Sequence, residues 1–567
     1  MTPVSRIAVV SVVAIVTAGA VVRPAQVEEP TVDVQVLAIN DFHGALEPAS
    51  GGNGRIGSVD AGGVEYLSTH LARLKAANPN TLIVSAGDNI GGTPLLSSLF
   101  HDEASIEALN VAGLQLSALG NHDLDEGWWE LLRMQKGGCH PVDGCQDGTP
   151  FSGASFTYLA ANVTLDPRKA DPDMRALAGV QGAEPRPLLP AFAIREINDV
   201  RVGFIGLVTE DVPQMIVPSS VRGLAFGPEA VAANAAARAL REQGVRAIVV
   251  LLHEGGEQTG AGINGCVGLS RSFVNLVSRM SDDIDIVVSG HTHHTYNCTI
   301  DGKLVTSASS GGRLVTDIDL RVRRSDGEVV AKTARNVIVT RDVAKDAAQT
   351  ALLEHYRSFG DAVGNRVVGS ITGSLTRDFN DAAEFSLGDV VADALLDAAR
   401  RTPGANADLA IWNPGGIRAD LTAVPGSGPT PVTYAQVFAV MPFGNELIVK
   451  TLTGTVLLQM LEEQFGVERA RIMQVSSGFT YAYDPSRPRG RRIVRESVRL
   501  NGEPLELTRR YRLATSNFLW DTGDGLTALG SGTDPILIGV DYDIVADYFS
   551  RHSPVQPGPQ NRIRRIR

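Results

Sequence analysis

The sequence lacks the features that would hold a long nucleic acid or drive phosphoryl transfer from a nucleotide. Of its 567 residues, 51 are Lys or Arg and 63 are Asp or Glu, so the formal net charge is −12. A field of that sign disfavours binding to a nucleic-acid polymer, and we expect none among the partners. No stretch matches GxxxxGK[ST], which disfavours a kinase or an ATPase of the P-loop type.

Long apolar runs are also scarce. The only one is IAVVSVVAIVTAGAVV, which follows Arg6. It predicts a signal peptide over residues 1–25 with cleavage near Ala18-Gly19-Ala20, and the alternative is an uncleaved anchor. The C-terminal NRIRRIR carries no lipidation signal. We therefore expect a secreted, extracytoplasmic protein, in the periplasm or cell envelope, without stable membrane insertion.

Cysteine is rare, with four in the chain. An even number in an exported protein usually forms disulfides, and four cysteines allow three connectivities. We expect Cys139 to pair with Cys145, which closes the short loop CHPVDGC, and Cys266 to pair with Cys298. The alternative is two pairs of buried thiols.

The length favours more than one hydrophobic core. Residues 33–340 alternate short apolar runs with helical patterns, which is typical of a layered α/β domain. The stretch from Asp342 to Phe359 predicts a connector helix, ended by Gly360, within residues 341–364. Strands, helices and Gly-rich turns over residues 366–550 predict a second, mixed α/β domain, so the whole chain is α+β.

Polar side chains follow five of the apolar runs in the first domain. They are Asn40-Asp41-Phe42-His43, Gly87-Asp88-Asn89, Gly120-Asn121-His122-Asp123, His253-Glu254 and Gly290-His291-Thr292-His293. In an α/β domain the loops at the carboxyl ends of strands meet in one crevice, where such folds place ligands. We therefore expect these side chains to form one site.

The donors of this site are carboxylates, imidazoles and an amide, with no thiolate. The candidate ligands are Asp41, His43, Asp88, Asn121, His253, His291 and His293. They are too many for one tetrahedral zinc and suit two divalent ions about 3.5–4 Å apart. Their chemistry favours Zn, Mn, Co or Fe over a pure magnesium or calcium site.

The segments NDFHG, SAGDNIGG, GNHDLDEG, LLHEGG and GHTH resemble the five blocks of the calcineurin-like metallophosphatases, in the form found in secreted 5′-nucleotidases. The resemblance covers residues 33–540. It implies a four-layer α/β/β/α sandwich with Asp88 bridging the ions. One ion would be held by Asp41, His43, Asp88 and His293, and the other by Asp88, Asn121, His253 and His291.

The same resemblance gives roles to the residues beside Asn121. His122 would face the phosphate as a hydrogen-bond donor or acid, and Asp125 would orient it. The alternative for His122 is a structural histidine. We interpret Asp123 as a solvated or capping residue.

The second domain carries the motifs WNPGGIRAD, VMPFGNEL, VSSGFTYAYD and NFLWDTGDG. Taken alone, Phe443 and Phe518 would be core residues and Arg418 a surface charge. The resemblance instead implies a nucleoside pocket, with the base stacked between the two phenylalanines. Its other members would be Asn445 at the base edge, Asp524 at the ribose, Asn413 and Arg418 at ribose or phosphate, and Gly478 at the wall. The chain departs from relatives that have arginines directly before the segment beginning at Glu384, because DAAEFSLGDVVAD has Ala382-Ala383 before Glu384. We expect Arg377 to serve instead as a phosphate contact.

These features predict an enzyme that removes phosphate from nucleoside 5′-monophosphates with metal-activated water. Alternatives within the family are UDP-sugars, 2′,3′-cyclic nucleotides and nucleoside di- or triphosphates. An alternative of another class is a catalytically silent, exported nucleotide- or surface-binding protein. The sequence leaves open whether the chain is a monomer or a dimer.

The remaining histidines and a tryptophan pair are interpreted as structural. His70 lies in a helical pattern, and Trp128-Trp129 is expected to pack rather than bind substrate. The other histidines are expected to lack ligand partners nearby: His101, His140, His355 and His552.

Overall fold

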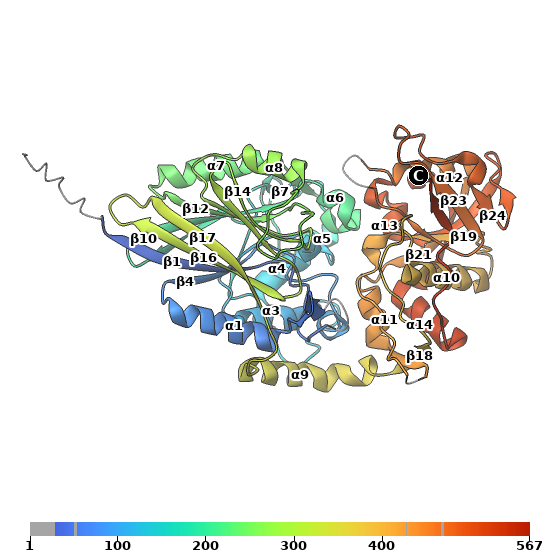
Figure 1. Ribbon diagram of the computed structural model, residues 1–567, viewed down its shortest axis with the longest axis horizontal. Coiled ribbons are helices and arrows are strands. Elements are labelled where there is room, and N and C mark those ends of the chain that lie inside the picture. The colour runs from blue at the N-terminus through green and yellow to red at the C-terminus, as the bar shows by residue number, and fades with distance from the viewer. Residues whose placement is uncertain (1–28, 50–53, 427, 467–469, 567) are drawn as a thin grey trace, which may run out of the picture.

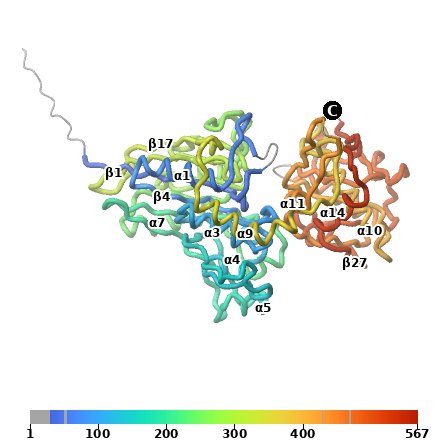
Figure 2. Tube along the Cα trace, turned by 90° about the horizontal axis from the view of Figure 1, so that it is seen from below, coloured from blue at the N-terminus to red at the C-terminus, as the bar shows by residue number. Residues whose placement is uncertain are grey.

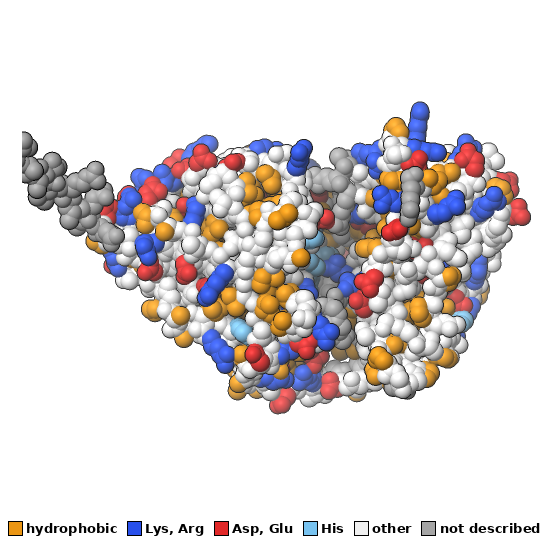
Figure 3. All heavy atoms as spheres, viewed as in Figure 1, with side chains coloured by type: hydrophobic (Ala, Val, Ile, Leu, Met, Phe, Trp, Pro, Cys, Tyr) orange, Lys and Arg blue, Asp and Glu red, His pale blue; other side chains and the backbone are white. Residues whose placement is uncertain are grey.

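The structure is a computed structural model that describes residues 29–49, 54–426, 428–466 and 470–566. Two bodies are joined by one long helix along their lower side (Figures 1 and 2), with a hollow between them (Figure 3). The expected signal peptide lies outside the described residues. Within those ranges no helix has the length and apolar character needed to cross a membrane.

The first body is built on two six-stranded sheets. The first sheet has the order β17 (Val329–Ile338), β16 (Leu314–Arg323), β1 (Thr31–Ile39), β4 (Thr81–Ser85), β5 (Leu116–Ala118), β6 (Thr157–Leu159). The second has the order β14 (Thr295–Ile300), β15 (Lys303–Ala308), β13 (Ile286–Ser289), β12 (Ala247–His253), β10 (Val200–Val208), β9 (Phe192–Ile197).

The two sheets face each other across an apolar layer. Val36 and Val84 of the first sheet and Val249 and Val288 of the second are fully buried in it. Helices α1 (Val64–Ala77), α3 (Glu103–Ala112) and α4 (Trp128–Lys136) cover the outer face of the first sheet, and α7 (Glu229–Glu242) and α8 (Arg271–Ser278) cover the second (Figure 1). The central strands β4, β10, β12 and β13 are nearly continuous apolar runs, because they are buried on both faces. The predicted four-layer α/β/β/α sandwich is confirmed.

The strands that precede the candidate ligands run in register at the centre of each sheet. In the first sheet β1 pairs in parallel with β4, and β4 with β5. In the second sheet β12 and β13 are parallel neighbours. Their carboxyl ends therefore open at the same edge of the sandwich, as the sequence predicted.

The second body combines a mixed sheet with helices on its faces. Its five-stranded sheet has the order β22 (Gln474–Val475), β19 (Leu409–Trp412), β26 (Arg510–Ser516), β21 (Glu446–Thr453), β27 (Thr533–Val540). A four-stranded sheet has the order β25 (Glu503–Pro504), β24 (Arg499–Leu500), β23 (Phe479–Tyr483), β28 (Ile563–Arg565). The main helices are α10 (Ser386–Arg401), α11 (Tyr434–Val440), α12 (Gly454–Glu463) and α14 (Asp541–His552).

The last strand, β28, lies beyond residue 550, where the sequence suggested that the second domain ends. It pairs in parallel with β23, so this segment is part of the second body. The domain limits 33–340, 341–364 and 366–550 otherwise remain a prediction.

The connector is helix α9 (Ala347–Gly364). It begins later than the sequence pattern suggested, because the Asp346 side chain caps it by accepting a hydrogen bond from the backbone N–H of Gln349 at 3.0 Å. It also continues through Gly360, which was expected to end it. Gly360 lies inside the helix and faces Leu96 and Leu99 of the first body. Close packing, rather than helix termination, explains this glycine.

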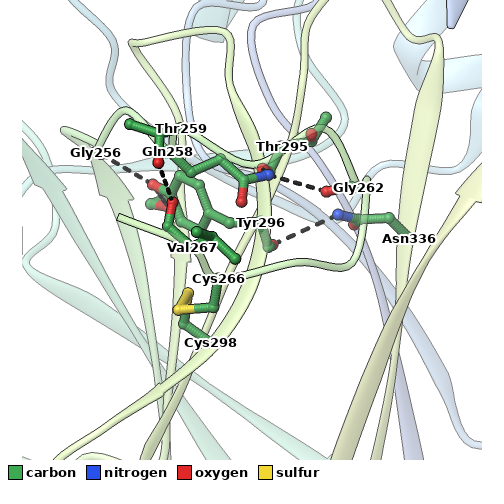
Figure 4. Close-up of a disulfide and its surroundings, with 11 residues drawn as sticks. Gly256, Gln258, Thr259, Gly262, Cys266, Val267, Thr295, Tyr296, Cys298 and Asn336 are labelled. Carbon is green, nitrogen blue, oxygen red and sulfur yellow. Dashed lines mark hydrogen bonds between the residues drawn. A yellow bond between two sulfur atoms is a disulfide. The ribbon is translucent and has the colours of Figure 1, made fainter. Parts of the chain in front are cut away.

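Both predicted disulfides are present. Cys139 bonds Cys145 and Cys266 bonds Cys298, with Cα–Cα distances of 4.6 and 5.3 Å. The second one joins the loop after β12 to strand β14 (Figure 4). In that loop the side-chain amide of Gln258 donates to the carbonyl of Gly262 at 2.9 Å. The disulfide therefore fastens a long loop to the sheet edge.

Replacing both Cys266 and Cys298 by Ser is expected to lower the free energy of unfolding by about 4 kcal/mol, because the disulfide closes a long loop in the unfolded chain. Urea unfolding of the oxidised proteins measures this. The matched control replaces Cys139 and Cys145, which are only 6 residues apart, and is expected to lose about 2 kcal/mol. A larger loss from the shorter loop would contradict the loop-length argument.

Candidate active site

The seven candidate ligands come together at the carboxyl edge of the sandwich. The Oδ2 atom of Asp88 lies 3.1 Å from Nε2 of His253 and 3.5 Å from Nε2 of His43. Asp41 Oδ1 lies 3.4 Å from Nε2 of His293. Asp88 thus contacts a histidine of each expected ligand set, which is the position that a bridging carboxylate would take.

The amide of Asn121 completes the cluster. Its Oδ1 atom lies 3.1 Å from Nε2 of His253 and 3.0 Å from Nδ1 of His291. Two groups, one of Asp41, His43 and His293 and one of Asp41, Asp88 and His253, each have ligand atoms within 4.8 Å of one another.

The ring orientations fit metal binding. Nδ1 of His43 donates to the carbonyl of Gly91 at 2.8 Å, and Nδ1 of His253 donates to the carbonyl of Ala86 at 2.9 Å. With Nδ1 protonated, Nε2 of each ring is the atom left to bind a cation, and it points at Asp88. The residues present therefore fit a pair of divalent ions.

The backbone at the ligands is unusual. Five of the seven have a positive φ: Asp41 at 50°, His43 at 46°, Asp88 at 51°, His291 at 71° and His293 at 58°. The left-handed region is disfavoured for residues with a Cβ, and such outliers are concentrated at functional sites. The turns at the strand ends, rather than side-chain rotamers alone, aim these ligands.

Burial sets the charge of the site. It lowers the pKa of His43 and of His291 to about 3. Burial alone would raise the pKa of Asp41, but the nearby His293 holds it at about 2. Asp88 outweighs burial and raises the pKa of His253 to about 10, so this pair holds a proton that a bound cation would displace. At neutral pH the other three side chains are in the forms that bind metal.

His122 and Asp125 form a pair beside the ligands. Nδ1 of His122 lies 3.0 Å from Oδ2 of Asp125, and the backbone N–H of His122 donates to Oδ1 of Asp88 at 2.8 Å. Burial lowers the pKa of His122, but the Asp125 and Asp88 carboxylates outweigh it and raise the pKa. This geometry favours a protonated imidazole next to the metal ligands.

The interpretation of Asp123 as solvated or capping was wrong. Its side chain is buried and accepts hydrogen bonds from four backbone N–H groups. They belong to Asp88 at 3.2 Å, Asn89 at 3.1 Å, Ile90 at 3.2 Å and Gly120 at 2.8 Å. Asp123 thus fastens the loop of Asp88 to the loop of Asn121. Apolar periodicity reports side-chain burial and carries no signal for such backbone contacts.

Replacing Asp123 by Ala is expected to lower the free energy of unfolding by about 3 kcal/mol, because buried backbone donors lose their acceptor. Asp123→Asn, which keeps one acceptor oxygen, is expected to lose less. Chemical unfolding of the two variants and the parent, all without added metal, measures the difference. Equal stability of the Ala variant and the parent would mean that water replaces the carboxylate.

Two side chains of the second body reach this site. The Phe443 ring stacks on the His122 ring, with centroids 5.3 Å apart and planes inclined by 23°. The guanidinium of Arg418 lies 5.5 Å from the Phe443 ring and contributes to the low pKa of His43. A cavity of about 290 Å³ lies between the bodies here, lined by Phe443 and Tyr542 on one side and by His122 and Asp125 on the other. Histidine and basic side chains are visible in the hollow (Figure 3).

The other expected pocket residues lie in the second body. Phe518 is 8% exposed and belongs to an apolar cluster. Each of the rest contacts a residue of the second body: Asn445 with Asp541 at 3.2 Å, Asp524 with Arg471 at 3.5 Å, Arg377 with Asp420 at 3.1 Å, Gly478 at a turn with φ +87° against Asn501, and Asn413 beside Gly416. The base sandwich of Phe443 and Phe518 stays a prediction.

Among the remaining histidines, His70 matches the expectation, whereas His101, His140, His355 and His552 have carboxylate neighbours. His70 bonds the carbonyl of Thr340 at 3.1 Å, as a structural residue would. His101 and His140 stack on each other beside carboxylates, so the expectation that they lack ligand partners was wrong. His355 also has a carboxylate partner, Asp147, at 3.1 Å. Trp128 is fully buried, which confirms its packing role.

The relatives of the chain share this architecture. A family model described as the C-terminal domain of 5′-nucleotidases matches residues 367–531. Cell wall protein Lmo0130 of Listeria monocytogenes is 30% identical over 550 residues, covering 93% of this chain and 68% of that protein. The chain belongs to the 5′-nucleotidase family. It is accordingly a hydrolase of the metallophosphatase type.

Two further relatives of this 5′-nucleotidase family member are a longer protein and a solved structure. Endonuclease YhcR of Bacillus subtilis is 29% identical over 541 residues, covering 94% of this chain but 41% of that protein. The chain thus spans less than half the length of that relative. The solved structure of a 5′-nucleotidase precursor from Thermus thermophilus has a TM-score of 0.76 at 26% identity, covering 94% of this chain and 99% of that one. The two-domain fold is that of the family.

Proposed function

We propose that this chain is an extracytoplasmic phosphohydrolase that removes the phosphate from nucleoside 5′-monophosphates with two divalent ions of the Zn, Mn or Co type. The observation that carries the proposal is the stacking of Phe443, from the second body, on His122, which pairs with Asp125 beside the seven candidate ligands. The ring of Phe443 and the guanidinium of Arg418, 5.5 Å apart, thus lie beside the candidate metal ligands. A nucleotide needs this combination, because its base is flat and apolar whereas its phosphate is charged.

The residues divide the chemistry among them. The seven candidate ligands would hold the ions, which when bound supply positive charge to the phosphate oxygens and activate water. His122, kept protonated by Asp125, donates a hydrogen bond to the phosphate as negative charge develops. The guanidinium of Arg418 adds a second donor from the second body. Phe443 holds the base by stacking and excludes water from this side of the cavity.

The test is phosphate release by the purified protein from AMP, UMP, ATP, UDP-glucose, 2′,3′-cyclic AMP and p-nitrophenyl phosphate, with Mn, Zn, Co or Mg and after chelation. A chelator-sensitive preference for AMP or UMP supports the proposal. Preference for another substrate would keep the metal site and refute the assigned specificity. Inactivity with every metal would favour a silent binding protein.

Replacing Phe443 by Ala is expected to raise KM for AMP about tenfold, because stacking and burial of the base are lost. The KM for p-nitrophenyl phosphate, which carries no nucleobase, should change less. Steady-state kinetics on both substrates gives the comparison, and Phe438→Ala, at the same cavity but not stacked on His122, is the matched control. An equal loss on both substrates would assign Phe443 to packing alone.

A further inference from the structure

A second group of metal-binding side chains lies outside the seven candidate ligands. His101, Glu126 and His140 offer ligand atoms within 4.8 Å of one another, and Asp143 borders the group. The histidine side chains are 18% and 7% exposed, whereas the carboxylates are accessible. The group opens on the same cavity as His122 and Asp125, because His101 and Glu126 line it.

Three separate segments supply these side chains. His101 lies in the turn before α3, where its φ of 48° is left-handed. Glu126 directly follows Asp125, the partner of His122. His140 and Asp143 belong to the loop closed by the Cys139–Cys145 disulfide. The group therefore joins parts of the chain that no strand pairing holds together within the described residues.

The contacts have the pattern of a metal site. Nδ1 of His101 lies 2.7 Å from Oε2 of Glu126, and Nε2 lies 2.9 Å from Oδ2 of Asp143. The same Asp143 oxygen lies 3.2 Å from Nδ1 of His140. Whichever nitrogen of His101 binds an ion, one carboxylate lies beside it as a further ligand and the other accepts the opposite N–H. A carboxylate in that outer position is the usual partner of a metal-bound histidine.

The two imidazoles lie side by side, and each offers a nitrogen within 4.8 Å of the other ligand atoms of the group. Their rings are nearly parallel, with centroids 3.7 Å apart and planes inclined by 14°. Two imidazoles with one or two carboxylates suit zinc in a tetrahedral site. Without a metal, the carboxylates instead hold a proton on His101 and raise its pKa to about 9, although burial alone would lower it. Zinc would displace that proton.

We propose that His101 and His140, with Glu126 and Asp143 on either side of His101, bind a third divalent ion of the zinc type. The ion stabilises the disulfide loop against the turn before α3. Through Glu126 it also holds the segment that carries Asp125. The site is structural, since none of its ligands is one of the seven candidate ligands at the strand ends that would hold the catalytic ions.

The experiment counts metal. The full-length protein is stripped with a chelator, loaded with Zn²⁺, passed through a desalting column and measured by mass spectrometry of the metal. We expect one zinc per chain fewer for His101→Ala/His140→Ala than for the parent. His355→Ala, which removes another histidine paired with a carboxylate, is the matched control and should bind as much zinc as the parent. Circular dichroism establishes that each variant is folded.

A milder variant distinguishes the loss of a metal ligand from local unfolding. Glu126→Gln should weaken the binding of the third zinc at least about tenfold in a titration of the stripped protein, with the fold unchanged. The proposal would be overturned if the parent and the double variant held equal zinc, or if the titrations of the parent and Glu126→Gln coincided. His101 would then be a protonated histidine between two carboxylates. The count needs no substrate, so its outcome is independent of the proposed function.

Discussion

His122→Ala is expected to lower kcat for AMP about 10²–10⁴-fold, which is the usual contribution of a positioned acid or hydrogen-bond donor. The imidazole lies at the rim of the ligand cluster and is held by Asp125 at 3.0 Å. It is none of the seven candidate ligands, so the metal content of the variant should equal that of the parent. Steady-state kinetics together with metal analysis measures both effects.

Asp125→Asn is the companion variant. Its side chain keeps the shape of aspartate but no longer favours the protonated imidazole. We expect a smaller loss of kcat than for His122→Ala. Activity should fall as the pH rises through the pKa of His122, and this fall should begin at a lower pH than in the parent, because Asp125 no longer raises that pKa. A His122→Ala variant with full activity would remove His122 from the mechanism. A variant with less metal would make it a positioning residue for the ligands.

Asp88→Asn is expected to lower kcat/KM by about 1,000-fold or more, since several kcal/mol of transition-state stabilisation depend on the metal charge. The Asp88 carboxylate contacts both His43 and His253, so its loss should reduce the metal content by one or two ions per chain. Asparagine tolerates the left-handed backbone that Asp88 adopts at φ 51°, which limits the damage to the fold. Metal analysis and kinetics with excess Mn²⁺ test this.

Asp317→Asn is the matched control for Asp88. Asp317 is equally buried but lies on β16, where it pairs with Arg335 at 2.8 Å. The control should keep the metal content and the activity while losing some stability. If Asp88→Asn kept the full metal content and lost only activity, the carboxylate would serve substrate rather than metal.

The sequence was most informative where chemistry and strand periodicity coincide. Asp41, Asp88 and His253 each follow or end an apolar run, and parallel strands bring such positions to one edge. The Cys139–Cys145 disulfide could also be predicted, because the two cysteines are near neighbours in the chain. Roles in the second domain, such as that of Phe443, came from family resemblance and not from any pattern.

Contacts between distant segments could not be predicted in this way. His101, Glu126 and His140 are separated by 25 and 14 positions, and no periodicity relates two turns and a disulfide loop. Asp123 was misjudged because its partners are backbone N–H groups, which every residue carries. Gly360 was misjudged because a glycine can end a helix or let a neighbour approach, and only packing separates the two.

The left-handed backbone at five candidate ligands has a consequence for how the site would respond to the supply of metal. Such conformations cost about 1–3 kcal/mol each and persist only where the surrounding structure enforces them, here through buried sheets and the carboxylate of Asp123. The ligands are thus set in place by folding and not by the ions. If the proposed ions bind here, we expect the protein to stay folded when they are removed and to regain activity when they are added back, without new synthesis.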